Sequence, residues 1–512
     1  MRVPTERRNA DLRPGSGTEI FWLAGILILA TALRLWRLGA KSLWLDEIMT
    51  VQKATTSFAA MLAQIRQHDA HPPLFQIVEW LWLRLEKNDL YARMPSVLAG
   101  VACVWLCFLI ARRLFDRKSA LAAAVMAALS CYGVFYSQEA RLHAFMTALF
   151  LGQFCLLLTI LERRGKAGWG LWLAYGALGL ASLYTYALCA LAIGALGLLY
   201  LWLTRRRNRQ FGRWLAVHAT IALLFLPWVP TLRARTAELD ASIRAHHDSI
   251  GRPSFPEVAG GIVVWTIGPR AWQPNRYLCA ALGLGCLLVA ARAAWRKNRR
   301  PVKILGVLFV VPLLLYLILP MPRVHVYEPK HLMFMQPLLL IALSGARWTI
   351  RKQGEKAKRI PILLIVALGF VAINALGLRE YFEPGFEKEN WRALAADVSN
   401  HLQANDLILF NPGYVGYAFD YYARIPADLP LIARASADPL LQPDVRIEGN
   451  PSRIWMVEDW SPVARPSRRM QTILNQKGWY PGTSRLMVGL LGNLKWTLYL
   501  PKDIAPEKGL FP

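Results

Sequence analysis

The sequence has few charged residues and few cysteines for its length. Only 18% of its 512 residues are Asp, Glu, Lys or Arg, whereas a soluble domain has about 25%. Hydrophobic residues make up 55%, and many apolar runs approach or exceed the roughly 20 residues that cross a bilayer. This shortage of charge excludes a soluble globular protein and predicts a polytopic membrane protein.

All seven cysteines fall inside apolar runs, and the large hydrophilic segments have none. They are Cys103, Cys107, Cys131, Cys155, Cys189, Cys279 and Cys286. No disulfide framework or metal-binding spacing follows from them, and we interpret them as small core residues.

The formal charge of +27 does not indicate a nucleic-acid partner. A nucleic-acid-binding protein carries its basic residues on one folded polar face, and no such domain is visible. Here the Lys and Arg residues bunch in short linkers between apolar runs, as cytoplasmic loops do under the positive-inside rule. We therefore expect contact with membrane lipids and no contact with nucleic acid.

Eleven membrane-spanning helices are predicted. They cover about 20–38, 94–114, 119–136, 142–161, 168–184, 185–204, 212–229, 272–291, 303–320, 331–349 and 360–379. We take the first as uncleaved, because its apolar stretch continues to Leu38. The run Leu74–Leu85 is short and broken by polar residues, so we expect it to lie in the membrane interface.

The basic linkers set the orientation. If the N-terminus is cytoplasmic, every inner linker is strongly basic, while the outer turn Tyr184–Tyr186 has no Lys or Arg. Arg34, Arg37 and Lys41, at the outer end of the first helix, are the main evidence against this orientation.

An odd number of spans places the end of the chain on the outer face. We predict a transmembrane domain over 1–379, with an outer catalytic loop at 39–93, and a small α/β domain over 380–512. In that domain we expect helices at 390–403 and 468–477 and strands at 406–410, 454–457 and 486–491.

Two adjacent carboxylates, Asp46 and Glu47, follow the first apolar run. A carboxylate at membrane level can accept a proton from an attacking hydroxyl or amine. The alternative is structural, because acidic residues favour the first turn of a helix.

Three further groups of polar residues fall on the same predicted face. His71-Pro72-Pro73 places a histidine at a rigid corner, and Tyr136–Arg141 places Glu139 and Arg141 at the outer end of a helix pair. An arginine there suits a lipid phosphate, although pairing with Glu139 or snorkelling to the interface would also explain it.

The third group precedes the tenth predicted span. It contains Arg323, His325, Lys330 and His331, which could form a second phosphate contact or be ordinary interfacial residues. Tyr184 and Tyr186 could line the same cavity or belong to an aromatic belt.

Four motifs in this order resemble a known family. They are Ser42–Glu47, His71–Leu74, Ala92–Gly100 and Tyr136–Arg141. The chain resembles the bacterial branch of the dolichyl-phosphate-mannose protein mannosyltransferase superfamily, whose GT-C glycosyltransferases include the aminoarabinose transferase of lipid A. The resemblance covers about 20–350 well and extends more loosely to the tail.

The resemblance implies a GT-C fold in the bacterial inner membrane, with the outer domain and loop in the periplasm. It implies inverting transfer of a sugar from a polyprenyl-phosphate donor to a glycan, lipid or protein acceptor. Asp46 would be the base or acceptor-orienting carboxylate, supported by Glu47, and Arg141 would hold the donor phosphate.

The chain departs from the family before the tenth span, where many relatives have an Arg-Tyr pair and this sequence has Lys330-His331. Lysine still neutralises a phosphate, but only as a point charge. No cofactor is required, although Asp46, Glu47 and His71 could bind a divalent metal ion.

Two other classes of protein fit part of the pattern. A transporter or flippase of lipid-linked sugars would use similar charged residues, but nearer the membrane midplane. A non-catalytic scaffold for envelope assembly would need no clustered ionisable groups at membrane level.

Overall fold

The computed structural model consists of two compact units. It describes residues 17–69, 71–204, 210–246, 255–268, 299–318, 328–345, 362–425, 433–436, 450–460, 468–490 and 493–503. The first unit comprises Met1–Trp36 and Ala54–Tyr381, and the second comprises Arg37–Lys53 and Phe382–Pro512. The second unit thus joins the C-terminal part of the chain to a short segment that follows the first long helix.

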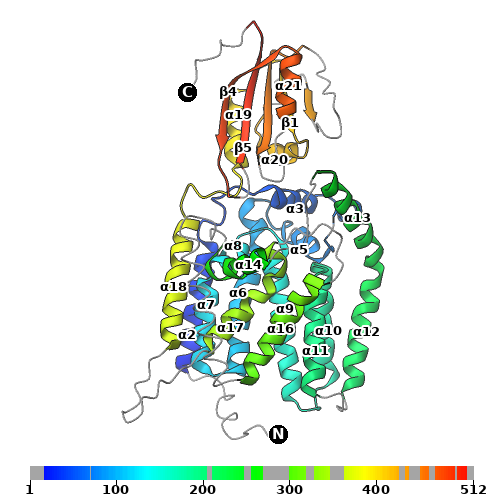
Figure 1. The fold of residues 1–512 in the computed structure, drawn as a ribbon, viewed down its shortest axis with the longest axis vertical. Coiled ribbons are helices and arrows are strands. Elements are labelled where there is room, and N and C mark those ends of the chain that lie inside the picture. Colours follow the sequence, from blue (N-terminus) through cyan, green and yellow to red (C-terminus); the bar gives the residue numbers. More distant parts are fainter. Residues whose placement is uncertain are drawn as a thin grey trace. The chain divides into compact units, whose positions relative to one another are not determined.

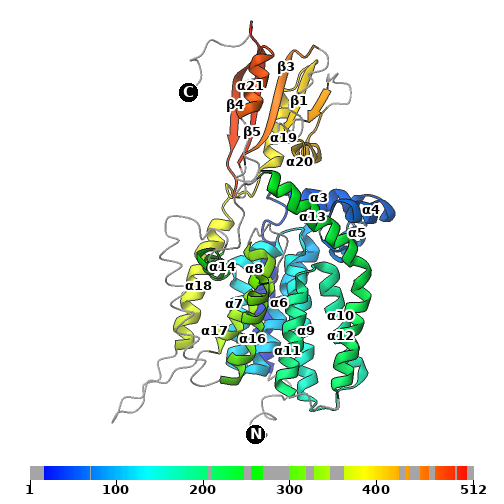
Figure 2. The same ribbon diagram turned by 45° about the vertical axis from the view of Figure 1, so that its right-hand side comes forward.

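The first unit is a helical bundle (Figures 1 and 2). Its longer helices are α2 (Gly17–Leu35), α6 (Asp89–Leu114), α7 (Arg117–Leu129), α9 (Leu142–Glu162), α10 (Trp169–Thr185), α11 (Cys189–Thr204), α12 (Phe211–Phe225), α13 (Val229–His246), α14 (Phe255–Ile267), α16 (Arg299–Ile318) and α18 (Ile362–Tyr381). The shorter ones are α4 (Phe58–His68), α5 (Leu74–Trp82), α8 (Cys131–Ser137), α17 (Gln336–Ser344) and the 3-10 helices η1 (Leu226–Trp228) and η2 (Pro329–Met335). Helix α6 packs against α7 and α9, α9 against α10, and α10 against α12.

Several of these helices can cross a membrane. By length and composition, five helices of the described residues qualify, and the bent pair α7–α8 makes a sixth if it is one span. The predicted polytopic helical fold is therefore confirmed, while the number eleven stays a prediction. The predicted span at 272–291 lies outside the described residues. Helix α5 has nine residues, fewer than the roughly 20 needed to cross.

The helix is interrupted between α7 and α8, and the two parts meet at an angle of 57°. Ser130 leaves helical geometry at the break, with ψ of 113°. Its hydroxyl oxygen accepts a hydrogen bond from Gln336 Nε2 at 2.7 Å, and Asn374 Oδ1 accepts one from the backbone N–H of Cys131 at 2.8 Å. Side chains of α17 and α18 thus satisfy polar groups that the break leaves in the bundle.

The second unit contains a mixed five-stranded sheet in the order β2-β1-β3-β5-β4. Its strands are β1 (Asp406–Asn411), β2 (Ala433–Ser436), β3 (Arg453–Trp460), β4 (Trp479–Met487) and β5 (Asn493–Pro501), and its helices are α19 (Trp391–His401), α20 (Val415–Tyr422) and α21 (Arg468–Gln476). β1 runs parallel to β2 and β3, whereas β5 runs antiparallel to β3 and β4. Every residue of β1 is buried, as fits an interior strand paired on both sides. The predicted C-terminal α/β domain is confirmed.

The strand predicted at 486–491 is wrong for most of its length. β4 already ends at Met487, and the backbone N–H of Gly489 donates to the side chain of Asn493 at 3.3 Å. The apolar run therefore continues past the end of β4, where a local hydrogen bond competes with the strand ladder.

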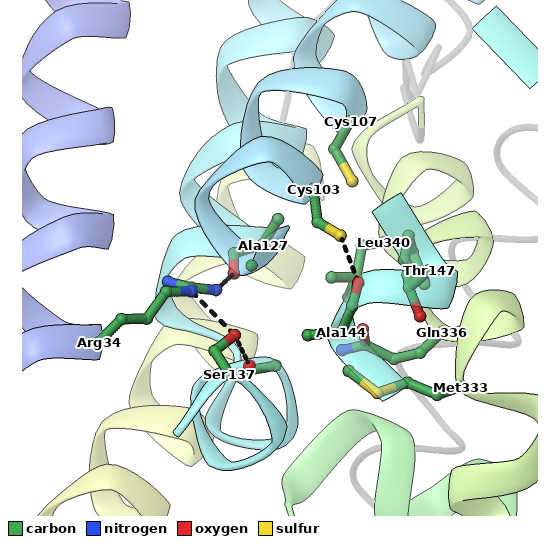
Figure 3. A pocket seen from close by; sticks show the side chains of 13 residues that line it. Arg34, Cys103, Cys107, Ala127, Ser137, Ala144, Thr147, Met333, Gln336 and Leu340 are labelled. Carbon is green, nitrogen blue, oxygen red and sulfur yellow. Dashed lines mark hydrogen bonds between the residues drawn. The ribbon is translucent and has the colours of Figure 1, made fainter. Parts of the chain in front are cut away.

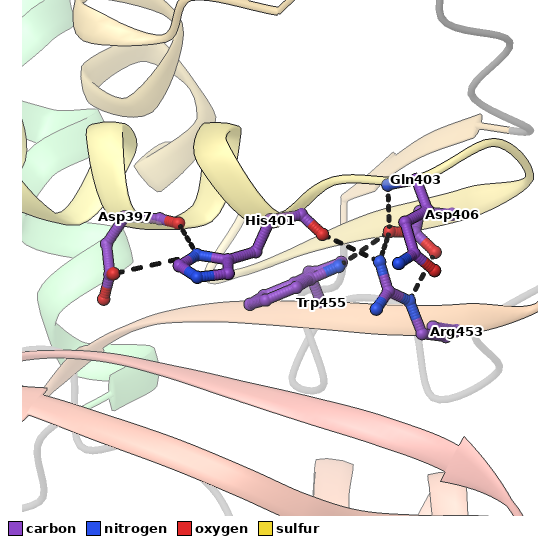
Figure 4. Close-up of polar contacts among 6 residues, drawn as sticks. All are labelled: Asp397, His401, Gln403, Asp406, Arg453 and Trp455. Carbon is purple, nitrogen blue, oxygen red and sulfur yellow. Dashed lines mark hydrogen bonds and ion pairs between the residues drawn. The ribbon is translucent and has the colours of Figure 1, made fainter.

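A buried carboxylate fixes the start of β1 to β3 (Figure 4). Asp406 is fully buried, and its two oxygens accept from Nε and Nη2 of Arg453 at 2.9 and 2.6 Å. It also accepts from Trp455 Nε1 at 2.9 Å and from the backbone N–H of Gln403 at 2.8 Å. The paired charge is fully hydrogen-bonded, so Asp406 has a structural role in the sheet.

Carboxylates of the C-terminal part also hold the segment Arg37–Lys53. The backbone N–H of Ser42 donates to Glu387 at 3.1 Å, and that of Leu45 donates to Glu389 at 2.9 Å. These bonds fix the backbone just before helix α3 (Leu45–Thr55), whose first turn carries the two adjacent acidic residues.

Glu389 is nearly inaccessible to solvent, and burial raises the pKa of its carboxyl from 4.5 to about 7. The negative charges of Asp459 and Asp46 raise this pKa further, whereas hydrogen bonds from Leu45 and Trp391 lower it. Both bonds go to the same oxygen, with Trp391 Nε1 at 2.7 Å. The other oxygen can therefore carry a proton without loss of either bond.

Replacing Glu389 with Gln tests this protonation. A raised folded-state pKa gives stability that is fully present below pH 4.5 and is lost as the pH rises through about 7. Glu389→Gln keeps an acceptor oxygen but does not ionise, so its melting temperature should exceed that of the wild type increasingly between pH 5 and 8. The difference at pH 8 should correspond to about 3 kcal/mol at most.

The measurement is a thermal melt of the purified full chain across this pH range. The pKa of Glu458 is also raised by burial, but that group is common to both proteins and cancels in the comparison. Glu383→Gln, at an exposed carboxyl nearby, is the matched control and should follow the wild type. Parallel curves for Glu389→Gln and wild type would contradict the assignment.

Candidate active site

Asp46 and Glu47 lie in the first turn of α3, in the second unit. Glu47 is fully buried, and its carboxylate accepts a hydrogen bond from the backbone N–H of Trp44 at 3.3 Å. A glutamate that reaches back three residues in this way caps the start of a helix. The two carboxylates therefore differ. Glu47 makes the helix-capping contact that the sequence offered as a structural alternative, and Asp46 is the half-buried carboxylate beside it.

His71 lies in the first unit, at the corner before α5. The backbone N–H of His71 donates to Asp69 Oδ1 at 3.0 Å, and its ring Nδ1 lies 3.1 Å from the same oxygen. The imidazole stacks on Tyr186, with ring centroids 5.4 Å apart and planes 17° apart. Tyr186 also contacts the ring of His331, at 6.1 Å between centroids. Three sequence-predicted residues from distant segments thus meet.

Arg141 lies at the N-cap position of α9, and its backbone carbonyl accepts a hydrogen bond from Ser96 Oγ at 2.9 Å. Two residues later, the ring of His143 is buried and meets Tyr136 edge-on at 5.2 Å. Neither ring nitrogen of His143 has a hydrogen-bond partner within the described part of the chain.

Several basic side chains lie near His143. Lys330, Arg141, His331 and His71 all act electrostatically on its ring. We call these five residues the basic cluster: His71, Arg141, His143, Lys330 and His331. The positive charges of Arg141 and Lys330 repel each other, so an anion bound between them would be stabilising.

Two carboxylates lie near the basic cluster. Glu328 forms an ion pair with Lys330, and both Glu139 and Glu328 act electrostatically on Tyr136. Glu139 is 1% exposed. The charge of Lys330 is therefore already partly balanced, and an incoming anion would compete with Glu328 for it.

Tyr184 belongs to a different group of residues. Its hydroxyl donates to the carbonyl of Leu224 at 2.8 Å, and its ring meets Phe225 edge-on. It packs on an apolar cluster formed by Met61, Ile65 and Trp228. The structure thus joins Tyr186 to the basic cluster and gives Tyr184 a packing role.

Sequence reasoning singled out four of the five basic-cluster residues, and it noted His143 beside the motif Tyr136–Arg141 without giving it a role. The signal was present, because His143 stands two residues after Arg141 near the start of an apolar helix. Arg323 and His325 lie outside the described residues. Among the described residues, no three His, Cys, Asp or Glu side chains form a group that could hold a metal ion.

The comparisons with known proteins agree with the helical architecture. Residues 70–230 match the family model described as dolichyl-phosphate-mannose-protein mannosyltransferase. No protein of curated function matches the sequence.

Two solved structures are similar over nearly the whole chain. ArnT from Cupriavidus metallidurans in the apo state is 14% identical, with a TM-score of 0.56, and the match covers 96% of this chain and 100% of that one. The same protein bound to undecaprenyl phosphate is 14% identical, with a TM-score of 0.53 and coverage of 94% and 98%. At this identity the likeness establishes the fold.

The long apolar helices, the C-terminal sheet domain and these matches lead to one conclusion: the chain is a multi-pass membrane protein with an ArnT-like GT-C fold, and its residues 70–230 match the dolichyl-phosphate-mannose-protein mannosyltransferase family model.

Proposed function

We propose that this protein transfers a sugar from a polyprenyl-phosphate donor to an acceptor at the periplasmic face of the bacterial inner membrane, with inversion at the anomeric carbon. The observation that carries the proposal is the basic cluster, which lies in a fold similar to that of an ArnT bound to undecaprenyl phosphate. The acceptor is a glycan, a lipid or a protein. The N-terminus would lie in the cytoplasm and the second unit in the periplasm.

The donor phosphate would bind at Arg141. A guanidinium binds two phosphate oxygens at once, which fixes the direction of the scissile bond. Lys330 would add a point charge after exchanging Glu328 for the phosphate. His143 would donate a ring N–H group to a phosphate oxygen, because its buried imidazole, which has no hydrogen-bond partner among the described residues, gains a hydrogen bond there. His331, in contact with Tyr186, would donate a second.

The cavity wall beside the phosphate would consist of His71 and Tyr186. Their stacked rings present a flat surface on which a sugar or the first isoprene unit can lie. Glu139 would orient Arg141 or a sugar hydroxyl.

Asp46 would act as the base or acceptor-orienting carboxylate, with Glu47 fixing the helix start that carries it. The acceptor oxygen or nitrogen attacks the anomeric carbon and gives its proton to Asp46. The bond from that carbon to the phosphate oxygen breaks, and the polyprenyl phosphate leaves with both electrons. Basic groups at the leaving phosphate stabilise the charge that develops on it.

The substitution Asp46→Asn tests the base. Positioned proton transfer contributes about 10²–10⁴-fold to a rate, so transfer should fall by at least about 100-fold while binding of the donor lipid is retained. Mass spectrometry of envelope lipids and glycans from a deletion strain that expresses the variant measures the product. Glu86→Gln, at an exposed carboxyl, is the control. Full transfer by Asp46→Asn would refute the role.

Substitution of Arg141 tests the phosphate site separately. Hydrogen bonds to charged groups contribute about 1.5–3 kcal/mol, so Arg141→Met should weaken undecaprenyl phosphate binding about 10- to 100-fold. Arg141→Lys keeps the charge and loses the bidentate geometry, so its loss should be smaller. Native mass spectrometry in detergent reports this affinity, with Arg163→Met, at an exposed arginine, as the control. Unchanged binding by Arg141→Met would place the phosphate elsewhere.

A further inference from the structure

A buried arginine lies within the first candidate span, away from the basic cluster. Arg34 of α2 is 1% exposed, and an ionised side chain at such a position is costly unless it has partners. Its hydrogen-bond partners among the described residues are neutral oxygens. Nη1 donates to the carbonyls of Ala30 and Ala128 at 3.1 and 3.3 Å, Nη2 donates to Ala127 at 3.2 Å, and Nε donates to Ser137 Oγ at 3.2 Å.

The carbonyls of Ala127 and Ala128 belong to the last turn of α7, which ends at Leu129. Carbonyls in the last turn of a helix lack an intrahelical donor and carry the negative end of the helix dipole. The break at Ser130 leaves them inside the bundle, away from bulk water. Arg34 therefore pairs with the negative end of the α7 dipole. The carbonyl oxygens there take the place that a carboxylate would have in an ion pair.

The same guanidinium also holds the far end of α8 (Figure 3). Ser137 is the last residue of α8, and its hydroxyl donates to the carbonyl of Gly133 at 2.6 Å while it accepts from Arg34. One side chain of α2 thus connects the end of α7 to the end of α8 and fixes the bend between them.

The next residue, Gln138, also binds the C-terminal end of α2. Nε2 of Gln138 donates to the backbone carbonyls of Arg34 and Trp36, both at 2.9 Å, and its Oε1 accepts from the hydroxyl of Tyr381 at 2.7 Å. The C-terminal end of α2 and the segment after α8 are therefore bound to each other from both sides. Arg141 follows Gln138 by three residues.

The contact between Arg34 and Ser137 leaves no room for a residue larger than Gly100 on α6. A Cβ added to Gly100 would lie 2.0 Å from Ser137 Oγ and 2.8 Å from Arg34 Nε. The adjoining cavity of about 20 Å³ is lined in part by Arg34, Cys103 and Gln336, which is the space of about one water molecule. A residue larger than glycine at position 100 would therefore displace Ser137 and Arg34.

We propose that Arg34 is a positioning residue for the phosphate site: by locking α8 against α7 and α2, it sets the place of Arg141. This inference rests on the proposed function, in which Arg141 binds the donor phosphate. Arg34 itself is buried in the bundle and is proposed to act through the backbone at Ser137 and Gln138.

A double-mutant cycle separates positioning from general stability. Arg34→Met should weaken undecaprenyl phosphate binding about tenfold, and Arg34→Lys should recover part of the loss because it retains the charge and one donor direction. In an Arg141→Met background, Arg34→Met should change the affinity less than twofold, because the group that it positions is gone. Melting temperature is recorded for every variant, since a purely structural role would lower stability and leave the two affinity losses additive.

Gly100→Ala gives a second route that keeps every charge. The added methyl group displaces Ser137 and Arg34, so phosphate affinity should fall as in Arg34→Met, even if the latter fails to fold. Gly25→Ala in α2, where an added Cβ meets nothing within 4 Å, is the matched control and should bind as the wild type does.

The outcomes distinguish the two proposals. If Arg141→Met alone leaves binding unchanged, the proposed phosphate site is wrong. If Arg141→Met weakens binding while Arg34→Met and Gly100→Ala do not, or if their losses add to that of Arg141→Met, the positioning role of Arg34 is refuted.

Discussion

The break between α7 and α8 is the constraint on which the first unit depends. A helix that ends inside an apolar bundle exposes carbonyl and N–H groups where there is no water, and each unsatisfied group costs several kcal/mol. Here Arg34, Gln336 and Asn374, from three other helices, satisfy groups at the break. The position of the chain at Tyr136–Arg141 follows from these bonds.

Ionisable groups are concentrated at the place where the phosphate is proposed to bind. Basic groups crowd around the buried ring of His143, and the carboxylates of Glu139 and Glu328 lie close by. Folding alone would favour fewer charges at such a site, because burying them costs more than their mutual pairing returns. A phosphate that enters the basic cluster would relieve the repulsion. The cost in stability is thus consistent with a binding function, as is common for clustered ionisable groups.

Much of the fold could be predicted from the sequence, because apolar runs of membrane length become helices whatever their neighbours are. The strand Asp406–Asn411 was also visible as a short buried run. The end of β4 at Met487 was not visible, because the backbone beyond it is held by hydrogen bonds from Gly489 to Asn493 and from Leu490 to Glu387. Composition alone does not separate an apolar turn from an apolar strand.

The sequence was enough to identify most residues of the candidate site, but not the role of each one. Tyr136–Arg141 stood out as a motif, yet Ser137 and Gln138 proved to be the residues that fix it, since their partners on α2 lie about a hundred positions earlier. Arg34, Arg37 and Lys41 counted against the predicted orientation, but each donates hydrogen bonds to backbone carbonyls. Their placement therefore reflects packing at least as much as topology. Tyr184 and Tyr186 looked equivalent in the sequence and differ only through their three-dimensional neighbours.

The most direct test of the account is a structure of the full chain in lipid nanodiscs with undecaprenyl phosphate. The account predicts phosphate density in contact with the Arg141 guanidinium and within hydrogen-bond distance of the His143 ring, with Lys330 released from Glu328. Phosphate density elsewhere, with the ion pair of Lys330 and Glu328 intact and His143 still without a partner, would contradict it.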